Sequence, residues 1–188
     1  FWQLEREDEK RELLSQKANR LTLAPLDAAK LPEQGDLEGV PVRLVGEYHE
    51  PVLLLDNKVL NGKVGFEAHQ LFLDNTGLFF LVNRGFVPMG RTREDQLKFP
   101  KVHDKPADIL GRVYQPSSQI LLLADQNQTL AEFPIIVQDI DVKKMIAALG
   151  ERVYPLVIRL EVEQLGSLPR YWPSTVMSPE KHKGYAIQ

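Results

Sequence analysis

The sequence predicts an α+β fold, with an antiparallel, barrel-like β core and flanking helices. Apolar residues with a period of two, which is typical of half-buried strands, recur between residues 40 and 162. Turn sequences join most of these segments, and regular crossover helices do not, which favours antiparallel neighbours. Residues 2–20 have a different composition, rich in Glu, Lys, Arg, Leu and Gln, and this composition indicates a helix.

The expected helix over residues 2–20 is mostly solvated. Its apolar residues Leu4, Leu14 and Ala18 form only a narrow stripe, and Pro25 closes the passage that follows. A surface helix without a function of its own explains this segment as well as a functional helix does.

Two strands are expected next. Residues 40–48 alternate between apolar positions and residues such as Arg43 and Glu47, which predicts a half-buried strand. Pro51 interrupts the pattern, because proline cannot donate a ladder hydrogen bond. Residues 52–55 therefore form a separate second strand in this prediction.

A hairpin is predicted from residues 62–73 and 78–88. Between them lies Asp74-Asn75-Thr76-Gly77, a sequence of turn formers. The second arm is apolar on both faces as far as Val82, so we expect it in the middle of the sheet. Residues 90–106 are charged and rich in proline, and predict an exposed, mobile loop.

The last predicted strands cover residues 108–114 and 154–162. Between them, Asp139-Ile140-Asp141 opens a predicted helix, which Gly150 ends. The two aspartates could pair as carboxylates, although helix capping is the simpler interpretation.

Composition excludes several classes of function. The chain has 188 residues, enough for one core, and a net charge of -3, which offers nothing to a phosphate backbone, so nucleic acid is not an expected partner. It has no cysteine, which excludes disulfides, thiolate nucleophiles and Cys-ligated metals. The longest apolar run, residues 78–82, is far too short to cross a membrane.

The sequence does not predict an enzyme. It contains no nucleophile elbow, no phosphate-binding loop and no His-Glu-x-x-His motif. The histidines, His49, His69, His103 and His182, are too scattered to build a metal site on one helical face. We therefore expect no catalytic residues and no resident metal, and we expect the first three histidines to be solvated or at the edge of the core.

Asn83, Arg84 and Gly85 end a buried strand in an unusual way. A buried arginine must find a carboxylate or several carbonyl groups, because an unpaired buried charge is costly. The simpler interpretation is structural: Asn83 and Arg84 hold neighbouring loops to the sheet, and Gly85 adopts a backbone angle that other residues resist. The alternative is that they bind a partner or an anionic ligand.

The C-terminal end, from Trp172 to Gln188, suggests a boundary. Residues 182–188 turn apolar without a cap, and both ends of the chain look like cuts through a longer protein. If a membrane helix follows, Trp172 and Tyr185 suit the headgroup layer. A histidine there, His182, could reach a metal or porphyrin at the membrane, or could be a capping residue.

A series of short blocks resembles the Surfeit locus protein one family, and covers nearly the whole chain. The blocks are Trp2-Gln3-Leu4-x-Arg6, Val45-Gly46-Glu47-Tyr48, Leu55-Asp56-Asn57, Gly65-Phe66-Glu67, Val82-Asn83-Arg84-Gly85-Phe86-Val87-Pro88, Gly111-Arg112-Val113 and His182-x-Gly184-Tyr185-Ala186-x-Gln188. Each block is weak by itself, but all of them in this order identify the family.

The resemblance implies a two-pass protein of the inner membrane. One membrane helix would end just before Phe1 and another begin around Gln188, with this domain on the periplasmic or mitochondrial intermembrane-space side. Residues 1–25 would be a juxtamembrane helix and linker, 26–175 the β-rich soluble domain, and 176–188 the segment that leads into the second membrane helix.

The resemblance also implies an assembly factor for haem-copper cytochrome c oxidase, which assists maturation or haem a insertion of subunit I. Subunit I and other assembly factors would be its partners. Haem a would be bound transiently, by the full-length protein alone, with His182 at the position of the proposed ligand. Lys183 stands where relatives often have an apolar residue, which places His182 at the water boundary.

Two hypotheses within oxidase assembly stay open. Copper-delivery factors for the same oxidase generally need soft thiolate ligands, and this chain has no cysteine, which favours haem handling or scaffolding. The alternative to haem handling is a non-haem scaffold that stabilises an assembly intermediate through the Arg84 region and residues 90–106.

Overall fold

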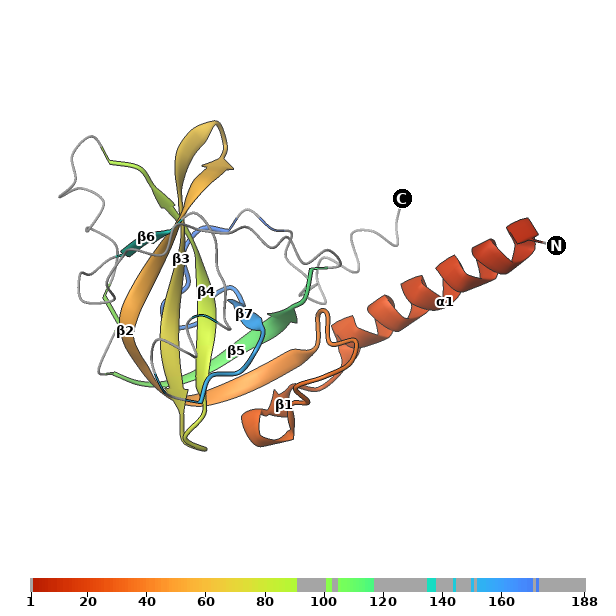
Figure 1. Cartoon of the computed structure of the whole chain (residues 1–188), viewed down its shortest axis with the longest axis horizontal. Coiled ribbons are helices and arrows are strands. Elements are labelled where there is room, and N and C mark those ends of the chain that lie inside the picture. The colour runs from red at the N-terminus through yellow and green to blue at the C-terminus, as the bar shows by residue number, and fades with distance from the viewer. Residues whose placement is uncertain are drawn as a thin grey trace.

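In the part of the chain that the structure describes, a mixed β-sheet curls into a near-closed ring, and one long helix precedes it (Figure 1). The structure is a computed structural model that describes residues 2–90, 101–102, 105–116, 135–137, 144, 150, 152–170 and 172. The helix, α1, spans Trp2–Thr22, and the sheet has seven strands. The predicted barrel-like β core with its N-terminal helix is confirmed.

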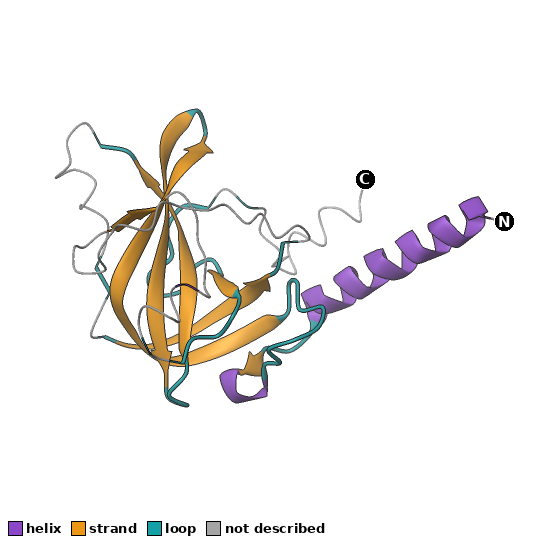
Figure 2. Cartoon of the chain, in the orientation of Figure 1, coloured by secondary structure: helices purple, strands orange, loops and turns teal. Residues whose placement is uncertain are grey.

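Figure 2 shows the strands in orange and the described helices in purple. The strands are β1 (Leu26–Asp27), β2 (Pro41–Leu60), β3 (Lys63–Asp74), β4 (Phe79–Pro88), β5 (Pro106–Tyr114), β6 (Ile135–Val137) and β7 (Val157–Leu160), with a short 3-10 turn, η1 (Ala28–Lys30), after β1. The ring runs β2-β3-β4-β7-β5, and β5 pairs back onto β2.

Most of the sheet is antiparallel, as the turn-rich sequence predicted. Parallel pairs are added where β1 and β6 join β2, and where β7 joins β4. The β4–β7 seam is short, with only Val82↔Ile158 and Asn83↔Arg159 in register. The ring is therefore near-closed, and it is not formally a barrel.

Pro51 does not end a strand, contrary to the prediction of two strands. It lies inside β2, which pairs with β3 from Gly46 to Leu60. The Glu50–Pro51 peptide bond is cis, and the register shifts between His49 and Val52. An irregularity in the ladder accommodates a residue without an N–H group, so the strand continues past it.

The predicted hairpin is confirmed as β3 and β4. Its turn closes through the N–H of Gly77, which donates to the Asp74 carbonyl at 2.9 Å. The Asp74 carboxylate accepts hydrogen bonds from the N–H groups of Thr76 and Val45 at 3.0 and 2.9 Å. As the apolar sequence of the second arm predicted, β4 lies inside the sheet, between β3 and β7.

The hydrophobic core fills the ring. Aromatic side chains contribute much of it: Tyr48 meets Phe72 edge to face, and Phe80 stacks on Tyr154, with ring centroids 5.1 and 5.2 Å apart. Burial raises the pKa of Tyr154 to about 12, and its hydroxyl donates to the Pro32 carbonyl at 2.6 Å. The residues before β2 are thereby fixed to the core.

α1 extends away from the ring and touches it at its C-terminal end (Figure 1). Trp2, Leu4 and Leu14 are each about two-thirds exposed, at 65%, 65% and 67%. At the other end, the Arg20 guanidinium donates to the Asp36 carboxylate at 2.9 Å and to the Glu38 carbonyl at 2.8 Å. The helix is mostly solvated, as predicted, and the Arg20 side chain helps to anchor its C-terminal end.

Several expectations reach beyond the described residues. Most of the predicted loop over 90–106 and most of the predicted helix opened by Asp139 lie outside them. Within that predicted helix, Lys144 is described and is helical, and Gly150, its predicted end, has a positive φ of 63°. The strand expected over 108–114 is β5, which begins two residues earlier, at Pro106. The strand expected over 154–162 is shortened to β7, because Val153 only bridges Phe79 and the chain leaves the sheet after Leu160.

Candidate functional site: an arginine latch under the C-terminal strap

Arg84 sits at a bulge in the middle of β4. In the β3–β4 ladder, Asn83 pairs with His69 and Gly85 pairs with Ala68, so Arg84 is the extra residue without a partner in that ladder. A bulge changes the direction of a side chain and frees backbone groups for other partners. At Arg84 the bulge redirects the side chain and also frees the backbone for other partners. The residue is only 1% exposed.

The side chain of Arg84 binds the segment that follows β7, residues 164–170, here called the strap. Its Nε donates to the Gly166 carbonyl at 2.8 Å, and its Nη1 donates to Oε1 of Gln70 at 2.8 Å. Its guanidinium carbon lies 5.8 Å from the centre of the Tyr48 ring. Burial lowers the pKa of Arg84.

Tyr48 is a second side chain that holds the strap from inside the ring. Its hydroxyl donates to the Leu165 carbonyl at 2.8 Å, one residue before the carbonyl that Arg84 binds. Burial raises the pKa of Tyr48 well above its usual range, and the nearby charge of Arg84 acts in the opposite direction. Both side chains therefore present buried donors to consecutive strap carbonyls.

Gly85 brings the backbone of β4 against the strap. Its φ of +128° lies in the region that favours glycine. A Cβ at this position would stand 2.7 Å from the Pro169 carbonyl oxygen and 2.8 Å from that of Leu168. On either side, the Leu168 N–H donates to the Arg84 carbonyl at 2.9 Å, and the Phe86 N–H to the Pro169 carbonyl at 2.6 Å.

Asn83 stiffens the bulge from the other face of β4. Its Oδ1 accepts from the Gly85 N–H at 3.1 Å, and its Nδ2 donates to Oε1 of Glu67 at 2.5 Å. Glu67 is also 3.6 Å from Nζ of Lys58. Asn83, Arg84 and Gly85 thus form one latch, in which each residue has a separate part in holding the strap.

A second cluster, centred on Arg112 of β5, joins the strap to α1. Nε of Arg112 donates to Oε1 of Glu161 at 2.8 Å, and Nη1 donates to the carbonyls of Arg20 and Gly39 at 3.1 and 3.0 Å. Glu161 also lies 3.9 Å from Nη2 of Arg170, in the strap. The sequence placed Arg112 in a family block, but gave it no role.

His69 is buried on the outer face of the ring, beside the latch. It is 3% exposed, and its Nδ1 lies 3.4 Å from the Glu67 carbonyl oxygen. Burial lowers its pKa; the Glu67 charge opposes this shift, and Lys58 and Arg159 add to it. Of the other histidines, His49 is partly exposed at the pocket described below, and His103 lies outside the described residues.

The burial of His69 predicts that the folded protein is less stable at acidic pH. Unfolded His69 takes up a proton near its ordinary pKa of about 6.5, whereas the folded residue does so only at lower pH. The unfolded state then binds more protons, so the free energy of unfolding falls as pH drops below about 6.5, by at most about 1.4 kcal/mol per pH unit.

Urea unfolding at several pH values, for the wild type and for His69→Gln, measures this effect. The variant should lose part of the slope below about pH 6.5. Equal slopes in the wild type and His69→Gln would contradict the assignment.

An open pocket of about 600 Å³ lies between the β3–β4 turn, β2 and the start of β5. Glu47, His49, Asp74 and Asp108 contribute to its wall. Asp74 already accepts the turn hydrogen bonds, and the Arg43 guanidinium, 2.5 Å from Asp108, lowers the pKa of that carboxyl. These carboxylates therefore serve the fold, and the latch is the better-built site.

His182 and Tyr185, the C-terminal residues that the sequence proposed for a site, lie outside the described residues. Within the described part of the chain, no group of His, Asp and Glu side chains has the arrangement of a metal site. The residues brought together are Asn83, Arg84 and Gly85, with the strap. Sequence reasoning missed Gln70 and Tyr48, whose polar side chains stand in otherwise apolar strands.

The fold and the latch define a β-ring protein carried on an exposed helix, whose C-terminal strap is fixed by a buried arginine. The sequence model of the SURF1 family matches residues 1–188, and the chain belongs to this family. A search of curated proteins finds no significant match.

Members of the SURF1 family are membrane-associated assembly factors of cytochrome oxidase, act with oxidase assembly intermediates and are generally not enzymes. In the described residues, no helix has the length and apolar character needed to cross a bilayer.

Proposed function

We propose that this protein assists the maturation of oxidase subunit I by handling haem a, with His182 as the haem ligand. Family membership supports the oxidase part of this proposal. The observation that carries the rest is the latch, because it fixes the strap only a short distance before the His182 motif. A ligand that follows a fixed segment has fewer positions to search, which lowers the entropic cost of binding.

The donor chemistry of this chain fits haem at one position. Neutral imidazole is a good axial ligand for haem iron. His69 is 3% exposed and buried against Glu67, so it does not stand open to a large ligand. His49 is partly exposed at the open pocket beside Glu47, but no motif in the sequence points to it as a ligand. His182 is the remaining candidate for which the sequence gives a reason. Bound haem would supply the iron centre that the oxidase subunit requires.

The same proposal implies a location for the protein in the inner membrane. The protein would pass twice through the inner membrane, with residues 26–175 as the β-rich domain on the periplasmic or intermembrane-space side. Residues 1–25 and 176–188 would lead to the two membrane helices. Haem a would be held transiently, by the full-length protein with both helices present.

The visible absorption spectrum of the full-length protein, purified in detergent from cells that make haem a, tests the role of His182. The wild type should carry a haem spectrum that His182→Ala loses. His49→Ala is the matched control and should keep the spectrum. Haem retained unchanged in His182→Ala would rule out this ligand.

A second candidate is a non-haem scaffold that stabilises an assembly intermediate. One observation favours it: the β2–β3 hairpin projects beyond the ring (Figure 1), and Val59 and Val64 near its tip are 60% and 50% exposed. Met89, 46% exposed, is joined to Val64 by a backbone hydrogen bond. Exposed apolar groups of this kind suit a protein partner.

The scaffold is tested by co-purification of subunit I. A triple variant with Val59→Ser, Val64→Ser and Met89→Ser should recover less subunit I than the wild type does. The haem content of the variant should stay the same. No haem in the wild type, together with this loss, would favour the scaffold. Full recovery of subunit I with the triple variant would count against it.

A further inference from the structure

A cluster of arginines on the outer face of the ring has a surplus of positive charge. Arg112 and Arg159 face each other across β5 and β7, and Arg170 of the strap lies beside them, near Glu161. Three guanidinium groups and one carboxylate give this cluster a net charge of +2. Arg112 is committed to Glu161 and two backbone carbonyls, so Arg159 and Arg170 carry the surplus.

Both of these arginines have buried donors that are not satisfied. Nε of Arg159 and Nη2 of Arg170 are inaccessible to solvent and lack a hydrogen-bond partner. The Arg170 side chain is only 10% exposed, and its distance of 3.9 Å from Glu161 is too long for a hydrogen bond. Burial lowers the pKa of Arg170, while Glu161 acts in the opposite direction. Unsatisfied donors on buried charges are costly and call for an explanation.

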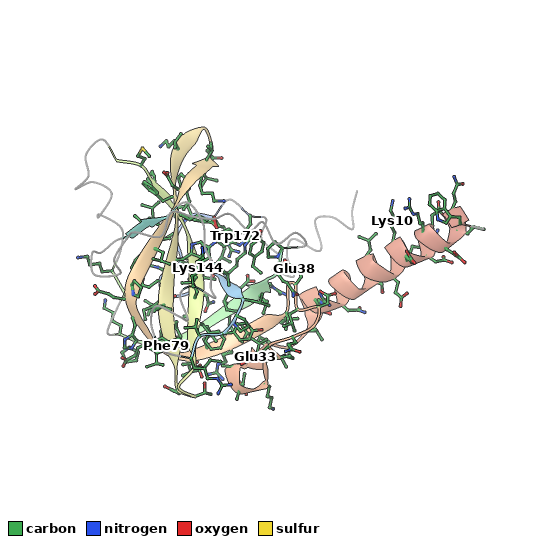
Figure 3. The ribbon with its side chains drawn as sticks, in the orientation of Figure 1. Lys10, Glu33, Glu38, Phe79, Lys144 and Trp172 are labelled. Atoms are coloured by element: carbon green, nitrogen blue, oxygen red, sulfur yellow. The ribbon has the colours of Figure 1, made fainter. Side chains whose placement is uncertain are left out.

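Aromatic rings hold both guanidinium groups in place. The guanidinium carbon of Arg159 lies 3.7 Å from the ring centre of Tyr114 and 4.9 Å from that of Trp172. That of Arg170 lies 5.7 Å from the Trp172 ring. Figure 3 labels Trp172 beside the strands of the ring. A guanidinium stacked by its face keeps its edge for acceptors in its plane.

We propose that Arg159 and Arg170, held against Trp172, bind a phosphate group. Its charge matches the surplus of the cluster, and Arg recognises phosphate oxygens through paired N–H groups. A tetrahedral anion also offers oxygens to two separately anchored guanidiniums, whereas a carboxylate offers them in a single plane. The phosphate belongs either to a lipid headgroup or to a free anion. The proposal is independent of haem.

Fluorescence of Trp172 tests the site directly. The chain has two tryptophans, so Trp2→Phe leaves Trp172 as the only reporter. In this background, inorganic phosphate should cause a saturable change in emission that chloride at equal ionic strength does not cause. Arg159→Gln and Arg170→Gln should each weaken the apparent affinity about tenfold or more, as expected for a lost charged hydrogen bond.

Controls separate binding from folding. Arg43→Gln removes an exposed arginine of the Asp108 pair and should titrate like the parent. Arg159→Lys keeps the charge without the paired donors, and should fall between the parent and Arg159→Gln. Thermal unfolding of each variant confirms that it is folded. No saturable change in the parent, or equal affinity in the parent and both Gln variants, would overturn the proposal.

Vesicle flotation distinguishes the two sources of phosphate. The 188-residue chain is mixed with vesicles of phosphatidylcholine, with and without phosphatidylglycerol. Flotation with the phosphatidylglycerol vesicles that is lost in Arg159→Gln assigns the site to a lipid headgroup. Phosphate binding by fluorescence without such flotation assigns it to a free anion.

Discussion

Arg84→Met should lower the free energy of unfolding by about 3 kcal/mol, because two acceptors lose a buried donor at about 1–3 kcal/mol each. The acceptors are the Gly166 carbonyl and the Gln70 side chain, both 2.8 Å from Arg84. Methionine fills much of the same space, so the loss measures the hydrogen bonds more than a cavity. Urea or thermal unfolding of the purified domain provides the measurement.

Two comparisons sharpen this result. Arg84→Lys retains a charge but cannot place two donors in one plane, so it should lose an intermediate amount of stability. Arg43→Met breaks an exposed, solvent-screened pair with Asp108 and should cost much less stability than Arg84→Met. Equal losses at Arg84 and Arg43 would mean that the latch does not hold the strap.

Gly85→Ala should cost about 2–6 kcal/mol and release the strap, since strain at positive φ and overpacking each cost about 1–3 kcal/mol. The added Cβ would press on the backbone oxygens of Leu168 and Pro169, and neither can turn aside as a flexible side chain could. Hydrogen exchange at the amides of Phe86 and Leu168 is the local readout, because both donate across the β4–strap contact. Their protection should fall more than that of the β2–β3 ladder.

Gly35→Ala is the matched control for this prediction. Gly35 has a similar φ of +104°, but nothing lies within 4 Å of where its Cβ would be. It therefore carries the backbone strain without the collision. If both substitutions cost the same and leave Leu168 protected, the close approach at Gly85 is not what keeps the strap in place.

The strands could be predicted from sequence because local pattern determines them. The hairpin of β3 and β4 has a turn sequence between two apolar arms, and it forms as expected. The continuity of β2 through Pro51 could not be predicted, since it depends on β3 continuing to pair on both sides of the irregularity. The parallel strand β6 pairs with residues more than seventy positions earlier in the chain, a distance that no local pattern covers.

The candidate site, too, could be predicted only in part from the sequence. The oddity of Asn83, Arg84 and Gly85 within an apolar strand was visible in the sequence, and so was the need of Arg84 for acceptors. Its acceptor in the strap, Gly166, lies 82 residues further along the chain, and only the fold identifies it. The contacts of Arg112 reach as far as Arg20, 92 residues away, for the same reason.

The contacts of Arg112 have a consequence for any partner that touches both flanks of the domain. The last turn of α1, Glu161 and the strap are linked through this one side chain and its neighbours. The distance between α1 and the strap is therefore fixed in the free protein. Such a partner would meet two contact points at a fixed separation and bind them as one bivalent surface, at a lower entropic cost than two independent segments would require.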